Sequence, residues 1–182
     1  MNGFLVELSY FANAQPVGDS IKRQETIERW EKMSKFINND LNNNKKGLEM
    51  GYTLPKVVVE RVIEQLSSII TSPTTSSFFY IPAAKDTDSY FQSELKAIIE
   101  GEIIPSIEQY KFFLETVYLP KARQSLSITS IPNGESCYAA LLRENTSLTI
   151  SAQEVFESGS RALEKKEAII KENLVNIFQF YL

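Results

Sequence analysis

The sequence predicts a mainly α-helical protein: a bundle of long helices with a kinked helix near Pro105 and a few short extended segments around 126–131 and 147–150. Two patterns along the chain and its composition favour this fold. Apolar residues recur every three or four positions through most of the chain, and capping residues or prolines stand where those runs begin and end. The hydrophobic share of 43% is enough for a core in 182 residues, so we expect a single helical domain over 1–182.

The opening stretch MNGFLVELSYFANAQP predicts a buried N-terminal helix. A signal peptide is disfavoured because no basic segment precedes the apolar run and Glu7 interrupts it. A second helix is expected after Asp19 or Ser20, either of which offers a capping oxygen. The asparagine cluster that follows weakens this helix, and Gly47 or Gly51 is expected to close it. Its apolar stripe comprises Ile21, Ile27, Trp30, Met33, Ile37 and Leu41.

The segment GYTLPKVVVERVIEQLSSIITSP predicts a third helix. Pro55 lies in its first turn, where the missing N–H costs nothing, and Pro73 ends it. Three consecutive valines suggest a strand, but the residues that follow keep the helical period, so a helix is favoured. The expected core positions are Val58, Val62, Leu66 and Ile69 or Ile70.

The segment at 71–89 is rich in serine and threonine and predicts a loop. Its three consecutive aromatic residues, Phe78, Phe79 and Tyr80, are expected to pin the loop to the core.

A long helix is expected to begin at Asp88 or Ser89. Pro105 lies inside its apolar pattern and should kink it, because proline removes a backbone hydrogen bond and crowds the preceding turn. Gly101, one turn earlier, allows the bend. Pro120 marks either a further kink or the end of the helix.

After residue 124 the pattern changes. The stretch SLSITSIPNGESCYAALLRENTSLTI alternates in polarity and holds a Pro-Asn-Gly turn, which predicts the extended pieces around 126–131 and 147–150 and a short helix between them. Ser151 and Glu154 form a capping box, so a final helix is expected from Ala152 to about Phe180. Its apolar positions are Val155, Leu163, Ile170, Leu174 and Ile177.

Composition excludes several functions. A formal charge of −4 argues against nucleic acid as a partner, because phosphate binding needs a basic face. No apolar run approaches the roughly 20 residues of a membrane-spanning helix, so no membrane span is expected. The single cysteine, Cys137, excludes an internal disulfide. It favours a cytoplasmic location, although a periplasmic or secreted parent protein stays open.

The chain contains no histidine. Histidine is the usual general base near neutral pH and the commonest zinc ligand, so its absence removes Ser-His-Asp and Cys-His catalysis and every H-E-x-x-H metal site. The carboxylates form no calcium-loop pattern, and the glycines form no phosphate-binding motif. We therefore expect no catalytic residue, no metal ligand and no cofactor in this chain.

Three segments resemble one family in the same order. GYTLPKVVVERVIEQL resembles its segment of a small residue, proline and V-V-x-R-V-I-x-Q-L, and YLPKAR at 118–123 resembles its Y-L-P-x-x-R. IPNGESCYAALLRENTSLTISAQEVFESG is similar to its P-x-G-x-x-Y-Y-x-x-L-x-R-x-x-T-T-x-x-L-T-x-x-E-I-H-x-x-G. This is the bacterial domain of unknown function 885 family, and the resemblance runs from about Ser9 to Gly159.

The resemblance implies a larger zincin-like architecture of which this domain is a part. Complete members are much longer and carry an H-E-x-x-P-G-H motif downstream of this segment. That motif would supply two zinc ligands and a general-base glutamate for hydrolysis of a peptide or amide bond. This chain matches an internal segment that lacks the motif, so zinc is implied for complete members only.

Residue by residue, the third segment agrees with the family at Gly134, Tyr138, Leu141, Arg143, Thr146, Leu148, Thr149, Glu154 and Gly159. It departs from the family at Cys137, Ser147 and Phe156, where tyrosine, threonine and histidine are usual. Gly134, Tyr138, Arg143 and Thr146 are candidate remnants of a substrate cleft. The alternative is that Tyr138 packs in the core and Arg143 pairs with an acid.

Two functional hypotheses follow. In the first, the chain is a non-catalytic segment of a zinc-dependent hydrolase whose uncovered apolar face drives self-association or binding of a complementary protein segment. In the second, it is a stand-alone helical interaction module that has lost the chemistry of the family. In either case we expect no activity from this chain alone.

Overall fold

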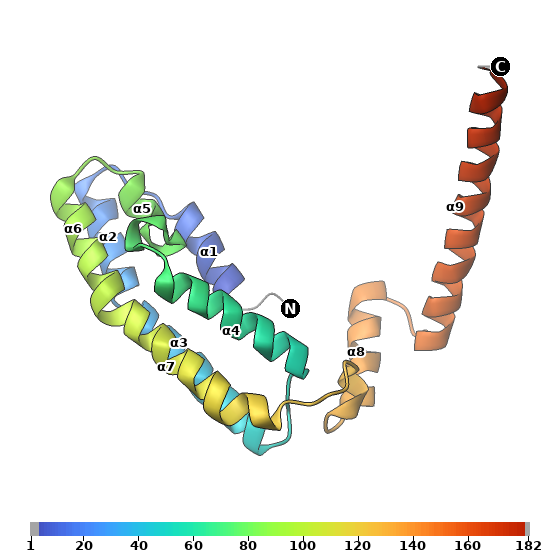
Figure 1. Cartoon of the computed structure of the whole chain (residues 1–182), viewed down its shortest axis with the longest axis horizontal. Coiled ribbons are helices and arrows are strands. Elements are labelled where there is room, and N and C mark those ends of the chain that lie inside the picture. Colours follow the sequence, from blue (N-terminus) through green and yellow to red (C-terminus); the bar gives the residue numbers. More distant parts are fainter. Residues whose placement is uncertain (1–3, 181–182) are drawn as a thin grey trace. The chain divides into compact units, whose positions relative to one another are not determined.

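The computed structural model describes the backbone of residues 4–180 and the side chains of 5–171. The chain divides into two compact units, an N-terminal unit (Met1–Leu126) and a C-terminal unit (Ser127–Leu182), shown in Figure 1. Helices dominate both units and residues 4–180 contain no β-strand, so the mainly α prediction is confirmed. The expectation of a single domain over 1–182 stays a prediction.

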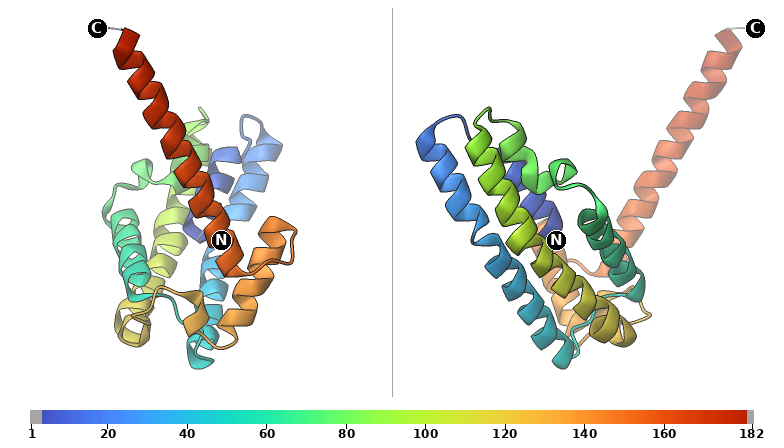
Figure 2. Two further views of the ribbon diagram at one scale, coloured as in Figure 1. Left: turned by 90° about the vertical axis from the view of Figure 1, so that its right-hand side faces the viewer. Right: turned by 60° about the vertical axis from the view of Figure 1, so that its left-hand side comes forward.

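The N-terminal unit consists of long helices joined by short turns. The helix α2 and its continuation α3 run alongside α6 and α7, and α4 packs against α7 (Figure 2). The helices are α1 (Phe4–Ala14), α2 (Ser20–Trp30), α3 (Met33–Glu49), α4 (Lys56–Thr71), α5 (Ile81–Ala84), α6 (Ser89–Ile98) and α7 (Ile104–Phe113).

The expected second helix is present but divided at residues 31–32 into α2 and α3. Asp19 caps α2 by accepting a hydrogen bond from the backbone N–H of Lys22 at 2.9 Å, as predicted. Ile21 was wrong as a core position, because it lies in the first turn on the solvent side and is 71% exposed. The asparagine cluster does not weaken α3, which continues to Glu49; Gly51 follows in a left-handed conformation (φ 81°).

The third helix, α4, ends before Pro73 as predicted, but Pro55 is its N-cap residue and does not lie in the first turn. Its buried stripe differs from the prediction by one residue at its start, because Val59 is buried whereas Val58 is exposed. Leu66 is buried as expected. The backbone N–H of Lys56 donates to the carbonyl of Arg123 at 2.8 Å, which ties the start of α4 to the segment after α7.

Two π-helical turns interrupt the long helix, each ending two residues before a proline. Ile99–Ile103 precedes Pro105, and Leu114–Tyr118 precedes Pro120. A wider turn relieves the clash between the proline ring and the carbonyl four residues earlier. The interruption expected near Pro105 is therefore present, and Pro120 lies in a 3-10 turn (Leu119–Lys121) that ends the helix.

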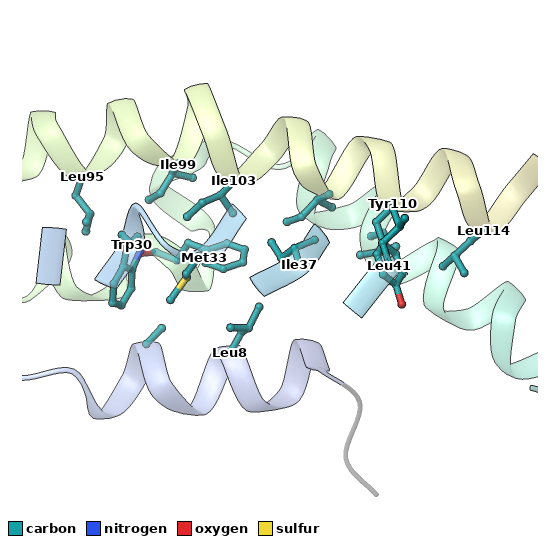
Figure 3. Packing of buried hydrophobic residues seen from close by; sticks show 14 of the residues in the cluster. Leu8, Trp30, Met33, Ile37, Leu41, Leu95, Ile99, Ile103, Tyr110 and Leu114 are labelled. Carbon is teal, nitrogen blue, oxygen red and sulfur yellow. The ribbon is translucent and has the colours of Figure 1, made fainter. Parts of the chain in front are cut away.

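The core of the N-terminal unit is continuous and lies between α1, α3 and the α6–α7 helix (Figure 3). The loop aromatics join it as predicted, since Phe79 is buried and its carbonyl accepts a hydrogen bond from the Trp30 indole N–H at 2.9 Å. Fully buried side chains include Trp30, Ile37, Val59, Leu66, Phe79, Leu95, Ile99, Ile103 and Ile107.

The C-terminal unit contains a 3-10 turn (Ile128–Ser130), α8 (Gly134–Thr146) and α9 (Ala152–Phe180). The short extended segments expected around 126–131 and 147–150 form no β-strand. Ser127 and Ile131, which flank the 3-10 turn, have extended backbone angles, and at 147–150 Ser147 is left-handed (φ 58°). The capping box is confirmed: a Glu154 carboxylate oxygen accepts from the backbone N–H of Ser151 at 2.7 Å. Leu174 and Ile177, predicted apolar positions of α9, lie outside the residues with described side chains.

Candidate functional site

Gly134 begins α8 at a point where no side chain fits. A Cβ atom added there would lie 2.0 Å from the carbonyl oxygen of Ile128 and 2.8 Å from Cα of Thr129. The preceding residue, Asn133, is left-handed (φ 54°) and turns the chain into the helix. The glycine therefore lets α8 pack directly on the 3-10 turn, which is a structural role.

Thr146 closes the other end of α8. Its hydroxyl donates to the carbonyl of Leu142 at 2.7 Å and accepts from the backbone N–H of Leu148 at 3.2 Å. These bonds satisfy backbone groups at the helix end, so this side chain is engaged in capping.

Arg143 and Tyr138 project from different parts of α8. Arg143 lines a shallow groove of about 380 Å³, whereas Tyr138 does not contribute to that groove. Tyr138 is 38% exposed, and no ion pair of Arg143 is present among the described residues; the alternative of packing and pairing stays a prediction. The other residues that line the groove are Ser136, Ala139, Ala140, Leu148, Thr149 and Ile150. The structure therefore does not bring the four predicted cleft residues to one place.

The chemistry available in this groove is binding. The guanidinium of Arg143 can hold a carboxylate through two parallel hydrogen bonds. Cys137 is exposed, but the chain has no histidine to activate its thiol.

A second groove, which the sequence analysis missed, lies in the N-terminal unit. It has a volume of about 550 Å³ between α1 and the α2–α3 pair. Its lining combines four apolar side chains with two cations: Leu8, Phe11, Arg29, Lys32, Met33 and Phe36. The sequence offered one signal for this groove: Phe11 and Phe36 are large apolar residues that do not belong to the predicted apolar stripe.

The most polar buried cluster of the N-terminal unit surrounds Asp86, whose side chain is fully buried. Arg23 donates to both of its carboxylate oxygens, at 2.8 and 2.9 Å, and the backbone N–H groups of Gly18 and Asp88 donate at 3.0 Å each. The Arg23 guanidinium, followed by these backbone donors, lowers the pKa of Asp86 to about 2. Every acceptor position is used, so the cluster is a structural clamp between the loop before α2 and the start of α6.

A second cluster joins α3 to α7. The Tyr110 hydroxyl donates to Asp40 at 2.8 Å and accepts from the Asn44 amide at 3.0 Å. Burial, and next the charge of Asp40, raise the pKa of Tyr110. The tyrosine is therefore held neutral as a hydrogen-bond donor between two helices.

Within the described part of the chain, no group of three or more Cys, Asp or Glu side chains is placed to hold a metal ion. Together with the absence of histidine, this donor set does not fit a zinc site. No helix among the described residues is long and apolar enough to cross a membrane.

The described residues form a mainly helical fold with a groove in each of its two units. The family model described as "Bacterial protein of unknown function (DUF885)" matches residues 1–180, so the chain belongs to this family. No curated protein matches the sequence.

The fold is also similar to a solved structure, "the putative lipoprotein from Colwellia psychrerythraea". The TM-score is 0.85 at 15% sequence identity, over 94% of this chain and 31% of the other. The chain thus spans about a third of that structure, and the likeness shows a shared fold.

Proposed function

We propose that this chain is the non-catalytic helical segment of a zinc-dependent hydrolase of the DUF885 family, and that its C-terminal unit is an assembly surface. The surface would bind either the part of the protein that carries the metal or a second copy of the chain. The observation that carries the proposal is the exposure of apolar side chains on α8 and α9.

Among described residues 127–171, Gly134 is the only one that is buried. Phe156, Leu163 and Ile170 are 69%, 60% and 56% exposed, and they recur every seven residues of α9. That spacing places them along one side of the helix. A continuous apolar stripe of this kind is unfavourable in water and marks a surface that another element covers.

The match to about a third of a longer solved structure of the same fold supports the same interpretation, because a longer protein of this fold has further chain to cover the stripe. The zinc chemistry is proposed for that further chain alone, because the donor set described here does not fit zinc. Phe156, which stands where the family usually has histidine, is exposed on α9 and belongs to the apolar stripe.

The test is co-expression. We expect a family segment that carries H-E-x-x-P-G-H to co-purify with this chain when both are expressed. Zinc-dependent cleavage of peptide or amide substrates is expected from the complex and not from this chain alone. A purified chain that is strictly monomeric, binds no hydrophobic dye and captures no such segment would contradict the proposal.

The lipoprotein description of the solved relative favours an extracytoplasmic location for the assembled protein, whereas the cysteine content favours the cytoplasm. Fractionation of the native host with an antibody against this chain distinguishes the two.

The second candidate is a stand-alone helical interaction module. The continuous core of the N-terminal unit favours it, because large side chains such as Trp30, Leu66 and Phe79 are already buried there within the described chain. A compact monomer that binds a partner through the N-terminal unit would support this candidate over the first.

A further inference from the structure

The groove between α1 and the α2–α3 pair combines an apolar floor with a positive rim. Leu8 and Met33 lie at its base and are buried, and Figure 3 shows Leu8 of α1 directed toward the Met33 region of α3. Phe11 and Phe36 are 58% and 45% exposed, so much of their surface is open to a ligand. No acidic side chain lines this groove.

The charges of the rim are not used elsewhere in the described chain. Lys32 has no ion-pair partner among the described residues, and Arg29 donates to the neutral amide oxygen of Gln15. Neither cation is neutralised by a carboxylate partner among the described residues, so both are available to an anionic ligand. They attract an anionic ligand to a region that is otherwise apolar.

The shape of the groove favours a helix as the ligand. Its α2–α3 wall presents side chains at positions 29, 32, 33 and 36, a spacing of three and four residues that forms a ridge along the helix axis. A second hollow of about 300 Å³ lies along α1 and is lined by Val6, Glu7, Tyr10 and Phe11, of which Glu7 alone is charged. The two hollows share Phe11, so the surface extends beyond one small ligand, as binding of a helix requires.

We propose that this groove binds an amphipathic α-helix of a separate protein, with its apolar side on Phe11 and Phe36 and its glutamate or aspartate side chains against Arg29 and Lys32. This site lies in the N-terminal unit and does not depend on the assembly surface of α8 and α9. Binding through the apolar side supplies most of the affinity, and the carboxylates select which helices bind.

The test uses two labelled synthetic peptides of about five helical turns that share one leucine stripe. One peptide carries glutamate and the other lysine at the positions that border the stripe. Fluorescence anisotropy with the full chain is expected to show binding of the glutamate peptide and binding of the lysine peptide at least about tenfold weaker.

Two groove variants and two matched controls assign the site. Phe36→Ser and Lys32→Glu are each expected to weaken the glutamate peptide about tenfold or more, while circular dichroism and thermal unfolding stay as in the unmodified chain. Phe112→Ser and Lys46→Glu make the same changes at exposed positions outside the groove and should leave binding unchanged.

Several outcomes would overturn the proposal. These are equal binding of both peptides, groove variants that bind as the unmodified chain does, or loss of binding in the control variants. Anisotropy competition by dodecanoate, or sedimentation with phosphatidylglycerol vesicles, that is stronger than peptide binding and sensitive to Lys32→Glu would assign the groove to a lipid. Light scattering that shows Lys32→Glu dissociating a dimer would assign it to a second copy.

Discussion

Both units of this chain consist of helices, but they differ in how completely their apolar side chains are buried. The N-terminal unit buries large side chains such as Trp30, Leu66 and Phe79 completely. In the C-terminal unit the described apolar side chains of α9 stay more than half exposed at Phe156, Leu163 and Ile170. Local signals, such as caps and periodicity, form helices in both units, but among the residues with described side chains only those of the N-terminal unit gain the hydrophobic burial that stabilises a fold independently.

The largest expected effect comes from a test of this difference, in which leucine is replaced by alanine once in each unit. Leu66→Ala removes a fully buried side chain and should lower the free energy of unfolding by about 2–5 kcal/mol. Leu163→Ala makes the same change on exposed α9 and should alter it by less than about 0.5 kcal/mol. Urea unfolding followed by circular dichroism measures both, and the fluorescence of Trp30, the single tryptophan, reports the N-terminal unit separately. Equal losses in the two variants would show that α9 has a core of its own.

The second prediction concerns the buried charge of Asp86. Its folded pKa of about 2 lies below the ordinary value of 3.8, so its contribution to stability is present above the ordinary value and is lost as the pH falls through about 2. Thermal unfolding between pH 7 and pH 2 should therefore show a loss of stability on acidification that Asp86→Asn diminishes. At pH 7 that variant should be less stable, because the guanidinium of Arg23 loses its carboxylate partner.

Asp19→Asn is the matched control. Asp19 pairs with Lys22 at 2.8 Å, but both side chains are about half exposed and solvent screens the pair. Its effect on the stability curve should be much smaller than that of Asp86→Asn. Indistinguishable curves for the two variants would mean that the Asp86 cluster is not the clamp of the N-terminal unit.

Much of the fold could be predicted from sequence because its causes are local. The caps at Asp19, Asp88 and Ser151 and the interruption near Pro105 all depend on neighbours within about five residues, and each is present. The family assignment also came from sequence alone, through three ordered motifs, and the match over residues 1–180 confirms it.

What sequence reasoning missed depends on contacts between distant segments. Arg23 and Asp86 are 63 positions apart, so no periodic pattern indicates their pairing. Val58 and Val59 both fit an apolar stripe, and only packing decides which one is buried. The groove between α1 and α2–α3 escaped notice for a related reason: Phe11 and Phe36 lie on different helices, and only the structure shows that both are exposed and line one groove. The role of Gly134 required the position of Ile128, which only the structure gives.

The third prediction concerns the close contact between α8 and the 3-10 turn at Gly134. Gly134→Ala places a Cβ atom 2.0 Å from the Ile128 carbonyl oxygen, so the 3-10 turn must separate from α8. We expect a local destabilisation of about 1–3 kcal/mol, seen as faster hydrogen exchange in residues 127–146. Gly159→Ala is the control, because a Cβ there meets no atom within 4 Å, and it should stabilise α9 by about 0.5–1 kcal/mol. Unchanged exchange in Gly134→Ala would show that the turn does not pack on α8.

The smallest expected effect tests whether local capping interactions, and not a packed core, stabilise α9. The Ser151 hydroxyl accepts from the backbone N–H of Glu154 at 3.2 Å, and the backbone N–H of Ser151 donates to the Glu154 carboxylate. The backbone and hydroxyl donors of Ser151 also lower the pKa of that carboxylate. Ser151→Ala removes the hydroxyl and should reduce the stability of α9 by about 1 kcal/mol, seen as lower helicity by circular dichroism.

Ser158→Ala changes the same side chain within α9, where no cap is formed, and should slightly raise helicity because alanine is the better helix former. In a helix held by a packed core, loss of one cap leaves helicity almost unchanged, since burial maintains the helix. We therefore expect Ser151→Ala to lose helicity in the free chain and to regain it when a partner covers the apolar stripe of α9. This result would show that burial of the stripe replaces the local cap in stabilising the helix. Loss of helicity that persists in the complex would instead indicate that the partner does not stabilise α9.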